Sequence, residues 1–359
     1  MKKFVLFLTF ALVGLLNAEV IKVGAVLPLT GEYEFAGAAM REGMRLGLEE
    51  FGPTKHRYKL LFEDSAFSPG KASLAAQRLI NVDHVNFITS MWSPTAMAVC
   101  PIAEAGKTVH LANDWDLRWT KEYVYTLNLA PPCDEFIRLQ IAILKKWGVR
   151  RIALIQENSA DWNFVVPSFI DAVKRDSSME IVSHETFIRP VRDFRTILIK
   201  IKEKNPDILL VWSILPESEI ILRHAYQMGI KCRMTGYLED LDEKALAEGR
   251  SFVRFINIGD GFASRYAKRF HKQALGATAT GYDQINAIIR TCEKFEKLPT
   301  DSLVLVDTMK KLSPWQGASG MVRPRDDKFL LLSYKIVKYK NGAMVPDPDF
   351  ADLNKEMGW

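Results

Sequence analysis

The sequence has few of the features that mark enzymes, metal sites and membrane-spanning proteins. Its six histidines are scattered, and it has no GxGxxG after the first strand, no P-loop, no GxSxG and no HExxH. Beyond the first 18 residues no segment is long and apolar enough to span a membrane. The sequence therefore gives no indication of catalysis, and it predicts neither a cofactor nor a bound metal.

Charge and cysteine content argue against two further classes. The formal net charge is only +5 and no basic stripe with interleaved aromatics occurs, so we do not expect nucleic-acid binding. The four cysteines form no CxxC pair and show no metal-like spacing. We expect buried free thiols, because cysteine is among the most often buried residues, and the sequence assigns no disulfide pairing. These cysteines are Cys100, Cys133, Cys232 and Cys292.

The N-terminus is typical of a secretory signal peptide. Lys2 and Lys3 precede an apolar run over 4–16, and Ala18 supplies the small residue that cleavage requires. A membrane anchor is the alternative, but this run is short for the roughly 20 residues of a spanning helix. No cysteine lies near the cleavage point, so we expect an unlipidated periplasmic protein cleaved near Ala18. About 341 residues remain, enough for two domains.

Strand-like and helix-like patterns alternate through the first part of the chain. The almost continuously apolar run over 20–27 predicts a parallel strand buried on both faces. Helical spacing of small and apolar residues follows over 36–51. The alternation then repeats, which predicts a parallel sheet covered by helices. The further strands are expected over 58–63, 85–89 and 108–111, and the further helices over 71–81 and 95–105.

A second series starts after Pro131 and Pro132. Helices are expected over 134–147, 161–175, 193–203 and 216–228, and strands over 151–156, 180–186, 207–212, 231–235 and 253–258. Long helices over 263–275, 281–297 and 301–312 follow, and 329–340 is expected to form a hairpin or one long strand. The fold class is therefore α/β, with two such units in succession. Open parallel sheets bind ligands at the carboxyl ends of their strands.

Several segments resemble type I periplasmic binding proteins, and the most similar branch contains the leucine/isoleucine/valine-binding protein. The opening segment 21–31, IKVGAVLPLTG, resembles the first strand and loop of that family. No single motif is specific, but the ordered set covers nearly all of the chain after the leader. Further matching segments are 63–65, 69–72, 93–96, 193–198, 205–207, 281–284 and 317–320.

The resemblance implies two flavodoxin-like parallel-sheet lobes joined by a three-crossing hinge. Carried over, residues 1–18 are the signal peptide, 19–130 plus 260–330 form lobe 1, and 131–259 plus 331–359 form lobe 2. The implied function is ligand capture by hinge closure. The ligand is an amino acid or amino-acid-like small molecule for an ABC importer, and the partner is an inner-membrane ABC permease. We expect a monomer, because each clamp contains a complete site.

Amino-acid binders of this family hold the ligand carboxylate after the third strand of lobe 1. The matching residues here are Trp92, Ser93 and Thr95, and a helix beginning near Pro94 would offer N–H groups and a positive dipole. Ser93 is equally well explained as a helix cap. After the next strand, Asn113, Asp114 and Asp116 are candidate ligand contacts, at positions where relatives carry small residues and Thr.

The two acids are candidates for binding a ligand ammonium, because buried acids usually have a partner. Asp116 is equally well placed to cap the next turn or to pair with Arg118. From the second lobe, Asp161, Trp162, Trp212 and Glu239 follow strands and match positions near the ligand. Trp162 is otherwise a core residue, and Glu239 is otherwise a solvated loop charge.

Three alternatives stay open. An enzyme would use the same α/β plan, but no catalytic motif supports it. A ligand-sensing subunit would use the same clamp. An amide, urea, a short peptide or an aromatic acid would fit the same fold, and the acids favour a ligand that carries positive charge.

Overall fold

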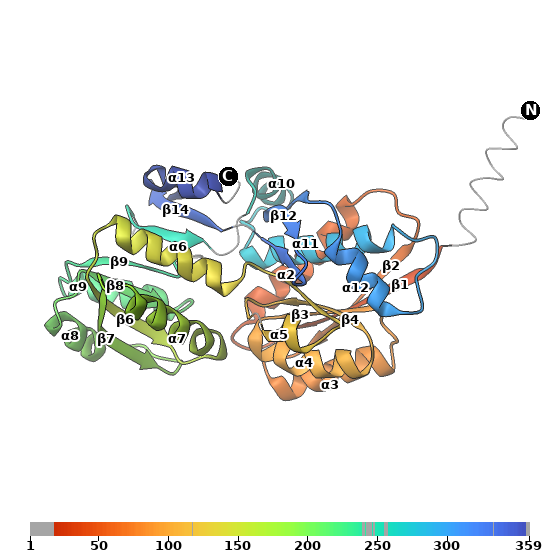
Figure 1. Ribbon diagram of the computed structural model, residues 1–359, viewed down its shortest axis with the longest axis horizontal. Coiled ribbons are helices and arrows are strands. Elements are labelled where there is room, and N and C mark those ends of the chain that lie inside the picture. Colours follow the sequence, from red (N-terminus) through yellow and green to blue (C-terminus); the bar gives the residue numbers. More distant parts are fainter. Residues whose placement is uncertain are drawn as a thin grey trace, which may run out of the picture. The chain divides into compact units, whose positions relative to one another are not determined.

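The computed structural model describes residues 18–116, 118–238, 241, 246, 248–254, 258–332 and 334–356. The chain divides into two compact units, and it passes between them three times. Unit 1 comprises Met1–Ala130 and Ile258–Leu332, and unit 2 comprises Pro131–Asn257 and Ser333–Trp359. The α/β fold class predicted from the sequence is confirmed, with parallel strands dominating the main sheet of each unit (Figure 1).

Unit 1 is built on an eight-stranded sheet of order β11-β12-β13-β5-β4-β3-β1-β2. Its first five strands along the chain pair in parallel, and the central β3 is buried at every position, as expected for a strand covered on both faces. The strands are β1 (Val20–Leu27), β2 (Arg57–Asp64), β3 (Phe87–Met91), β4 (Val109–Asn113), β5 (Thr126–Leu129), β11 (Trp315–Gly317), β12 (Gly320–Pro324) and β13 (Phe329–Leu331).

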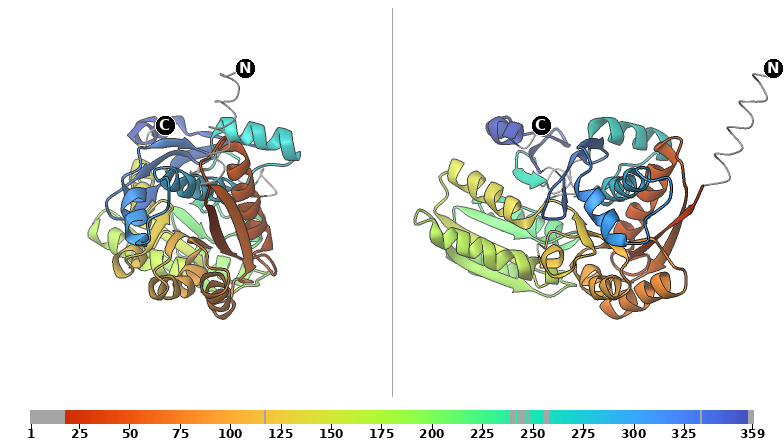
Figure 2. Two further views of the ribbon diagram at one scale, coloured as in Figure 1. Left: turned by 90° about the vertical axis from the view of Figure 1, so that its right-hand side faces the viewer. Right: turned by 45° about the vertical axis from the view of Figure 1, so that its right-hand side comes forward.

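Helices cover both faces of this sheet (Figure 2). The apolar sides of α3 and α4 pack on β1 and β3, around Val26, Leu79, Ile88 and Val99. The remaining helices include α2 and α11, which lie on the opposite face. The helices of unit 1 are α2 (Glu34–Glu50), α3 (Pro69–Asn81), α4 (Ser93–Ala105), α5 (Arg118–Glu122), α10 (Asp260–Phe270), α11 (Gly276–Cys292) and α12 (Ser302–Lys310).

Two glycines let α2 and α11 approach each other closely. A Cβ on Gly43 would lie 1.9 Å from the carbonyl oxygen of Thr278, and one on Gly281 would lie 2.2 Å from that of Met40. Real Cβ atoms do not approach backbone oxygens so closely, so the two helix backbones are in contact only because both positions lack a side chain. The late helix α11 thereby completes the unit that the N-terminal residues begin.

Asp283 of α11 fixes the turn that joins β11 and β12. Its carboxylate accepts hydrogen bonds from the backbone N–H groups of Ala318 at 2.7 Å and Ser319 at 2.8 Å, and the side chain is fully buried. A Cβ on Gly317 would lie 2.2 Å from the Asp283 carboxylate. Burial raises the pKa of Asp283 to about 6, even though these hydrogen bonds favour the charged form.

Unit 2 has a four-stranded parallel sheet of order β7-β6-β8-β9 and a three-stranded antiparallel sheet of order β10-β14-β15. Its strands are β6 (Arg151–Glu157), β7 (Glu180–Phe187), β8 (Ile208–Trp212), β9 (Arg233–Gly236), β10 (Ser251–Arg254), β14 (Lys335–Lys340) and β15 (Ala343–Pro346). Its helices are α6 (Cys133–Lys146), α7 (Ala160–Arg175), α8 (Arg195–Glu203), α9 (Glu217–Gln227), the 3₁₀ turn η2 (Pro348–Phe350) and α13 (Ala351–Glu356).

Apolar side chains of α8 and α9 pack on one face of the parallel sheet, around Leu198, Leu209, Val211 and Ile221. The sheet's Trp212 contacts aromatic rings of α6 and α7 instead, with Phe136 and Phe169 at centroid distances of 5.7 and 4.8 Å. The two helix pairs therefore sandwich the sheet of unit 2.

Three sequence-based expectations are corrected. The segment 329–340 is neither a hairpin nor one strand, because β13 belongs to unit 1 and β14 to unit 2. The helices expected over 263–275 and 281–297 are α10 and α11, and α10 ends earlier because His271 adopts a left-handed conformation at φ 54°. The short strands β5, β11, β12 and β15 were not predicted.

The four cysteines are free thiols. Cys100, Cys133 and Cys292 are buried and Cys232 is half-buried. Burial raises the pKa of Cys100 and Cys292 to about 12 and that of Cys232 to about 11. These thiols are therefore weak nucleophiles in the folded chain.

Candidate ligand-binding site

In unit 1, four neighbouring parallel strands end at the same edge of the sheet. The last residues of β1, β2, β3 and β4 are Leu27, Asp64, Met91 and Asn113. The Asp64 carboxylate holds the loop after β1, because it accepts hydrogen bonds from Leu29 N at 2.8 Å and from the Thr30 hydroxyl. Its slight burial favours the neutral acid, but these bonds outweigh that effect and hold the pKa of Asp64 below its ordinary value. This carboxyl edge is where open parallel sheets bind ligands.

Three aromatic rings gather at this edge. Tyr33 follows β1, Phe67 follows β2 and Trp92 follows β3, and their ring centroids lie 4.2 to 5.7 Å apart. Phe67 and Trp92 have φ angles of 57° and 62°, a region that costs a residue with a Cβ of order 1–3 kcal/mol. Such strain clusters at functional sites. Trp92 was predicted from the sequence, whereas Tyr33 and Phe67 were missed, although both lie in loops that follow strands.

The predicted hydroxyls lie in the first turn of α4. Ser93 is the first residue of this helix, and Thr95 is buried. The Thr95 hydroxyl has no hydrogen-bond partner in the part of the chain that the structure describes. The first N–H groups of an α-helix have no partner within the helix and carry a partial positive charge. This end of α4 therefore combines helix N–H groups with a buried hydroxyl whose hydrogen-bonding capacity is unused.

Asp114 is held by donors from its own unit. Its carboxylate accepts hydrogen bonds from the Ser93 hydroxyl at 2.9 Å, from the Trp119 indole N–H at 2.6 Å and from Asp116 N at 3.2 Å. The residue is only 3 % exposed. Its charge contributes to the raised pKa of Cys100. Asp114 therefore links the loop after β4 to the N-terminus of α4.

Asp116 pairs with Arg118, the alternative that the sequence left open. The Arg118 side chain donates to both carboxylate oxygens, with contacts from 2.5 to 3.1 Å, and Asp116 is buried. This pairing raises the pKa of Arg118. Asn113 is buried, and its side-chain amide donates to the Leu129 carbonyl at 3.1 Å. Both side chains therefore fix the loop after β4.

Behind α4, His110 forms a buried polar cluster. It lies 2.8 Å from the Ser90 hydroxyl and 3.5 Å from the Cys100 thiol. Complete burial lowers the pKa of His110 to about 3, so the ring is neutral at physiological pH. The cluster therefore adds no charge next to the site.

Unit 2 places aromatic rings after β6 and at the end of β8. Trp162 stacks on Trp212 with centroids 5.5 Å apart, and Tyr237 meets Trp162 edge-on at 6.0 Å. Trp162 is 4 % exposed and Trp212 is fully buried, so Trp212 is a core residue in this unit. Asp161 lies in the first turn of α7. Glu239 lies outside the described residues.

The carboxyl edge of this second sheet also carries a buried ionic cluster that the sequence analysis missed. Arg189 lies 2.9 Å from Glu217 and 3.4 Å from Glu157, and all three side chains are almost inaccessible. Arg189 also donates to the Leu215 carbonyl at 2.7 Å. Burial raises the pKa of Glu157 despite the attraction of Arg189, and the charge of Glu217 adds to the rise. Sequence separation hides such a cluster, since its members follow three different strands.

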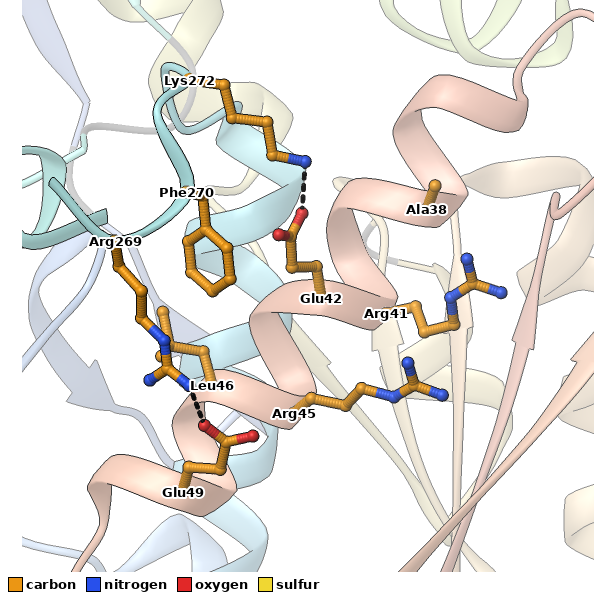
Figure 3. A pocket seen from close by; sticks show the side chains of 9 residues that line it. All are labelled: Ala38, Arg41, Glu42, Arg45, Leu46, Glu49, Arg269, Phe270 and Lys272. Carbon is orange, nitrogen blue, oxygen red and sulfur yellow. Dashed lines mark hydrogen bonds and ion pairs between the residues drawn. The ribbon is translucent and has the colours of Figure 1, made fainter. Parts of the chain in front are cut away.

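A hollow of about 350 Å³ lies elsewhere in unit 1, between α2 and α10 (Figure 3). Its acids are already paired across it, Glu42 with Lys272 at 2.7 Å and Glu49 with Arg269 at 2.5 Å. None of the predicted site residues lines it. The candidate ligand contacts therefore lie at the carboxyl edge of each unit's parallel sheet, considered by itself.

The chain belongs to the periplasmic binding protein family. A family model with that description matches residues 20–343, nearly the whole of the described chain. The resemblance found in the sequence is thereby confirmed. A comparison with curated protein sequences finds no match.

Solved structures share the fold over almost the whole chain. The leucine-binding protein LivK of Thermotoga maritima is 20% identical with a TM-score of 0.80, covering 91% of this chain and 97% of its own. A solute-binding protein of an ABC transporter from Rhodopseudomonas palustris, in complex with 3,4-dihydroxybenzoic acid, is 19% identical with a TM-score of 0.80, covering 91% and 95%. The isoleucine complex of LivJ from Streptococcus pneumoniae is 18% identical with a TM-score of 0.77, covering 90% and 97%.

Two features are absent from the described residues. No helix among them has the length and apolar character needed to cross a membrane. Within the same residues, no group of three or more His, Cys, Asp or Glu side chains is arranged to hold a metal ion.

Proposed function

We propose that this chain is the solute-binding subunit of an ABC importer, exported to the periplasm with its leader removed near Ala18. It captures an amino acid or amino-acid-like small molecule and delivers it to an inner-membrane permease. The family supports this role, because its structurally similar members include proteins described as leucine-binding and as isoleucine-bound. The two units correspond to lobes 1 and 2 of the expected clamp, which closes on the ligand and works as a monomer without catalysing a reaction.

One observation carries the proposal. At the junction of β3 and α4, a strained Trp92 precedes a helix N-terminus with the buried, unpartnered hydroxyl of Thr95. Strain and an unsatisfied buried polar group are both destabilising, and they are retained where a ligand uses them. We assign Trp92, Ser93 and Thr95 to direct ligand contact, and Asp114, Asp116 and Asn113 to holding the loop beside them.

A second ligand class has a specific observation in its favour. The cluster of Tyr33, Phe67 and Trp92 offers flat apolar surface at the site, and aromatic rings pack on one another with a favourable geometry. Structurally similar solute-binding proteins carry 3,4-dihydroxybenzoic acid and benzoate. An aromatic acid is therefore the second candidate.

A thermal-shift screen tests the function. The chain from Glu19 would be unfolded and refolded to remove bound ligand, then heated with amino acids, amides, urea and aromatic acids. A ligand at 100 times its Kd stabilises the fold by about 2.7 kcal/mol. Tyr33→Ala should abolish the shift, whereas Tyr226→Ala should keep it, because Tyr226 is 74% exposed on α9. The proposal fails if no compound shifts the melting temperature and native mass spectrometry of unrefolded protein finds no bound molecule.

Transport and sensing are separated by a second assay. Stimulation of ATP hydrolysis by an ABC permease complex from the same organism, when liganded protein is added, supports import. Ligand binding without any stimulation points to the sensing subunit instead.

A further inference from the structure

The hollow between α2 and α10 is lined by more cations than acids (Figure 3). Four of its lining residues are basic and two are acidic, which gives the lining a formal net charge of +2. All of them belong to unit 1, and none belongs to the candidate site at the carboxyl edge of its sheet. The basic residues are Arg41, Arg45, Arg269 and Lys272, and the acidic residues are Glu42 and Glu49.

Both acids are engaged by donors from α10 and the residue pair that follows it. Glu42 accepts hydrogen bonds from the Lys272 ammonium and from the Tyr266 hydroxyl, both at 2.7 Å. Glu49 accepts from the Arg269 guanidinium at 2.5 Å. The hydrogen bond to Glu42 raises the pKa of Lys272, which therefore stays charged. The negative charge of the lining is thus balanced by the two cations on the α10 side.

The other two cations have no carboxylate in the part of the chain that the structure describes. The Arg41 side chain has no ion pair or hydrogen bond there, and Arg45 has only a contact with the Phe62 ring, 5.4 Å from its centroid. Residues four apart on a helix are surface neighbours, and Figure 3 shows both side chains leaving α2 side by side, away from Arg269. Two neighbouring guanidinium groups present a set of donors that matches the oxygens of an anion.

Apolar side chains line the hollow as well. Ala38 and Leu46 come from α2 and Phe270 is the last residue of α10. Leu46 is buried and Phe270 is half-buried, so part of the Phe270 ring surface is accessible. A volume of about 350 Å³ is at the small end of ligand pockets. The hollow therefore suits a small anion that carries an apolar part.

We propose that this hollow binds a phosphate monoester with a small apolar or aromatic group. The phosphate bonds to Arg41 and Arg45, and the organic group packs on Leu46 and Phe270. A phosphate monoester carries a charge of about −1.5 to −2 at pH 7, which matches the +2 of the lining better than a carboxylate does. The inference is independent of the proposed function, because the hollow lies apart from the candidate ligand contacts.

Calorimetry on the chain from Glu19 at low salt tests the binding. Phenyl phosphate is compared with phenyl sulfate, which has nearly the same shape but one negative charge, and with benzoate. We expect phenyl phosphate to bind about fivefold or more tightly than the other two, since an ion pair at a partly exposed position contributes up to about that factor. Added salt should weaken the binding, because exposed charges are screened.

The same phosphate group occurs in soluble compounds and in lipid head groups, and a vesicle assay separates these sources. The protein is sedimented with phosphatidylcholine vesicles that contain or lack phosphatidic acid. Binding of phenyl phosphate without sedimentation supports a soluble monoester. Sedimentation only with phosphatidic acid supports a lipid phosphate.

Three variants and one control assign the effect to the hollow. Arg41→Gln and Arg45→Gln should each weaken the binding of phenyl phosphate about fivefold. Glu49→Gln should strengthen it, because the net charge of the lining rises and Arg269 is released. Arg57→Gln is the control, because Arg57 is exposed at the start of β2, does not line the hollow, and loses the same charge. It should leave the Kd unchanged, and melting temperatures check that all four variants fold.

Four results would overturn the phosphate site. They are binding unaffected by Arg41→Gln and Arg45→Gln, an equal loss in Arg57→Gln, phenyl sulfate binding as tightly as phenyl phosphate, and no binding of either phosphate probe. A glutamate-rich peptide that binds more tightly than both phosphate probes would also overturn it, in favour of an acidic protein surface. The solute-binding role stands in each case, because its screen uses other compounds and the Tyr33→Ala variant.

Discussion

Replacement of Asp283 by Asn should change how stability depends on pH. The pKa of Asp283 is raised from 3.8 to about 6, chiefly by burial. A group with a raised pKa in the fold binds its proton more tightly there, so its favourable contribution is complete below the unfolded pKa and is lost as the pH rises through the folded pKa. A pKa near 6 against 3.8 corresponds to about 3 kcal/mol. Asn has the same shape and no titration in this range.

The free energy of unfolding would be measured by urea denaturation of both proteins between pH 3.5 and 7.5, followed by tryptophan fluorescence and circular dichroism. The wild-type value minus the Asp283→Asn value should fall by about 2 kcal/mol from pH 4 to pH 7, because part of the full difference lies below pH 4. Asp207→Asn is a control, because its pKa is lowered and its effect on stability should therefore change with pH in the opposite direction. Asp207 accepts from the N–H groups of Arg150 and Arg151, both at 2.8 Å, and these bonds lower its pKa. Its stabilising effect is therefore lost as the pH falls. A difference that is constant with pH for Asp283→Asn would refute the reasoning.

Three further predictions follow from packing and burial. Gly317→Ala should destabilise the chain by about 1–3 kcal/mol in thermal unfolding, because the added Cβ would overlap the Asp283 carboxylate. An unchanged melting temperature would show that the turn between β11 and β12 shifts to make room for the Cβ. Arg189→Met should cost about 3–5 kcal/mol in urea denaturation, because two buried acids lose their cation, and a loss below 1 kcal/mol would show that they are solvated. Ellman's reagent should label Cys232 before the other three thiols, as mass spectrometry of the labelled peptides would show.

Much of the fold could be predicted because it depends on local patterns. Buried parallel strands give continuous apolar runs, and β1, β6 and β8 were found from theirs. Element ends were harder to predict, since tertiary contacts set them. The strand β5 has only four residues and pairs with β13, about 200 residues later in the chain. So short a segment has no local sequence pattern that predicts a strand. The prediction for 329–340 was wrong for a similar reason, because this one apolar run contains two strands, β13 and β14, that belong to different sheets.

The sequence predicted which loops carry the candidate site, but it did not predict which partners the side chains in those loops have. The rule that ligands lie at carboxyl ends of parallel strands selected the loops holding Trp92 and Asp114. Sequence could not show that Asp114 and Asp116 already have partners, because those partners depend on how the loop after β4 folds. The cluster of Glu157, Arg189 and Glu217 was missed for a related reason, since its members are far apart in the chain. Glu239 remains a prediction.

The discontinuity of unit 1 has a consequence for the chain as it is being made. The sheet begun by β1 to β5 stays incomplete until β13 has been synthesised, and α2 lacks its neighbour until α11 appears. At 5–20 residues per second, roughly 200 residues take about 10–40 s. Through that interval α3 and α4 can cover one face of the sheet, but the face that α11 covers and the edge of β5 lack their late partners. The order of the chain thus keeps its N-terminal part open to the machinery that receives unfolded nascent polypeptides.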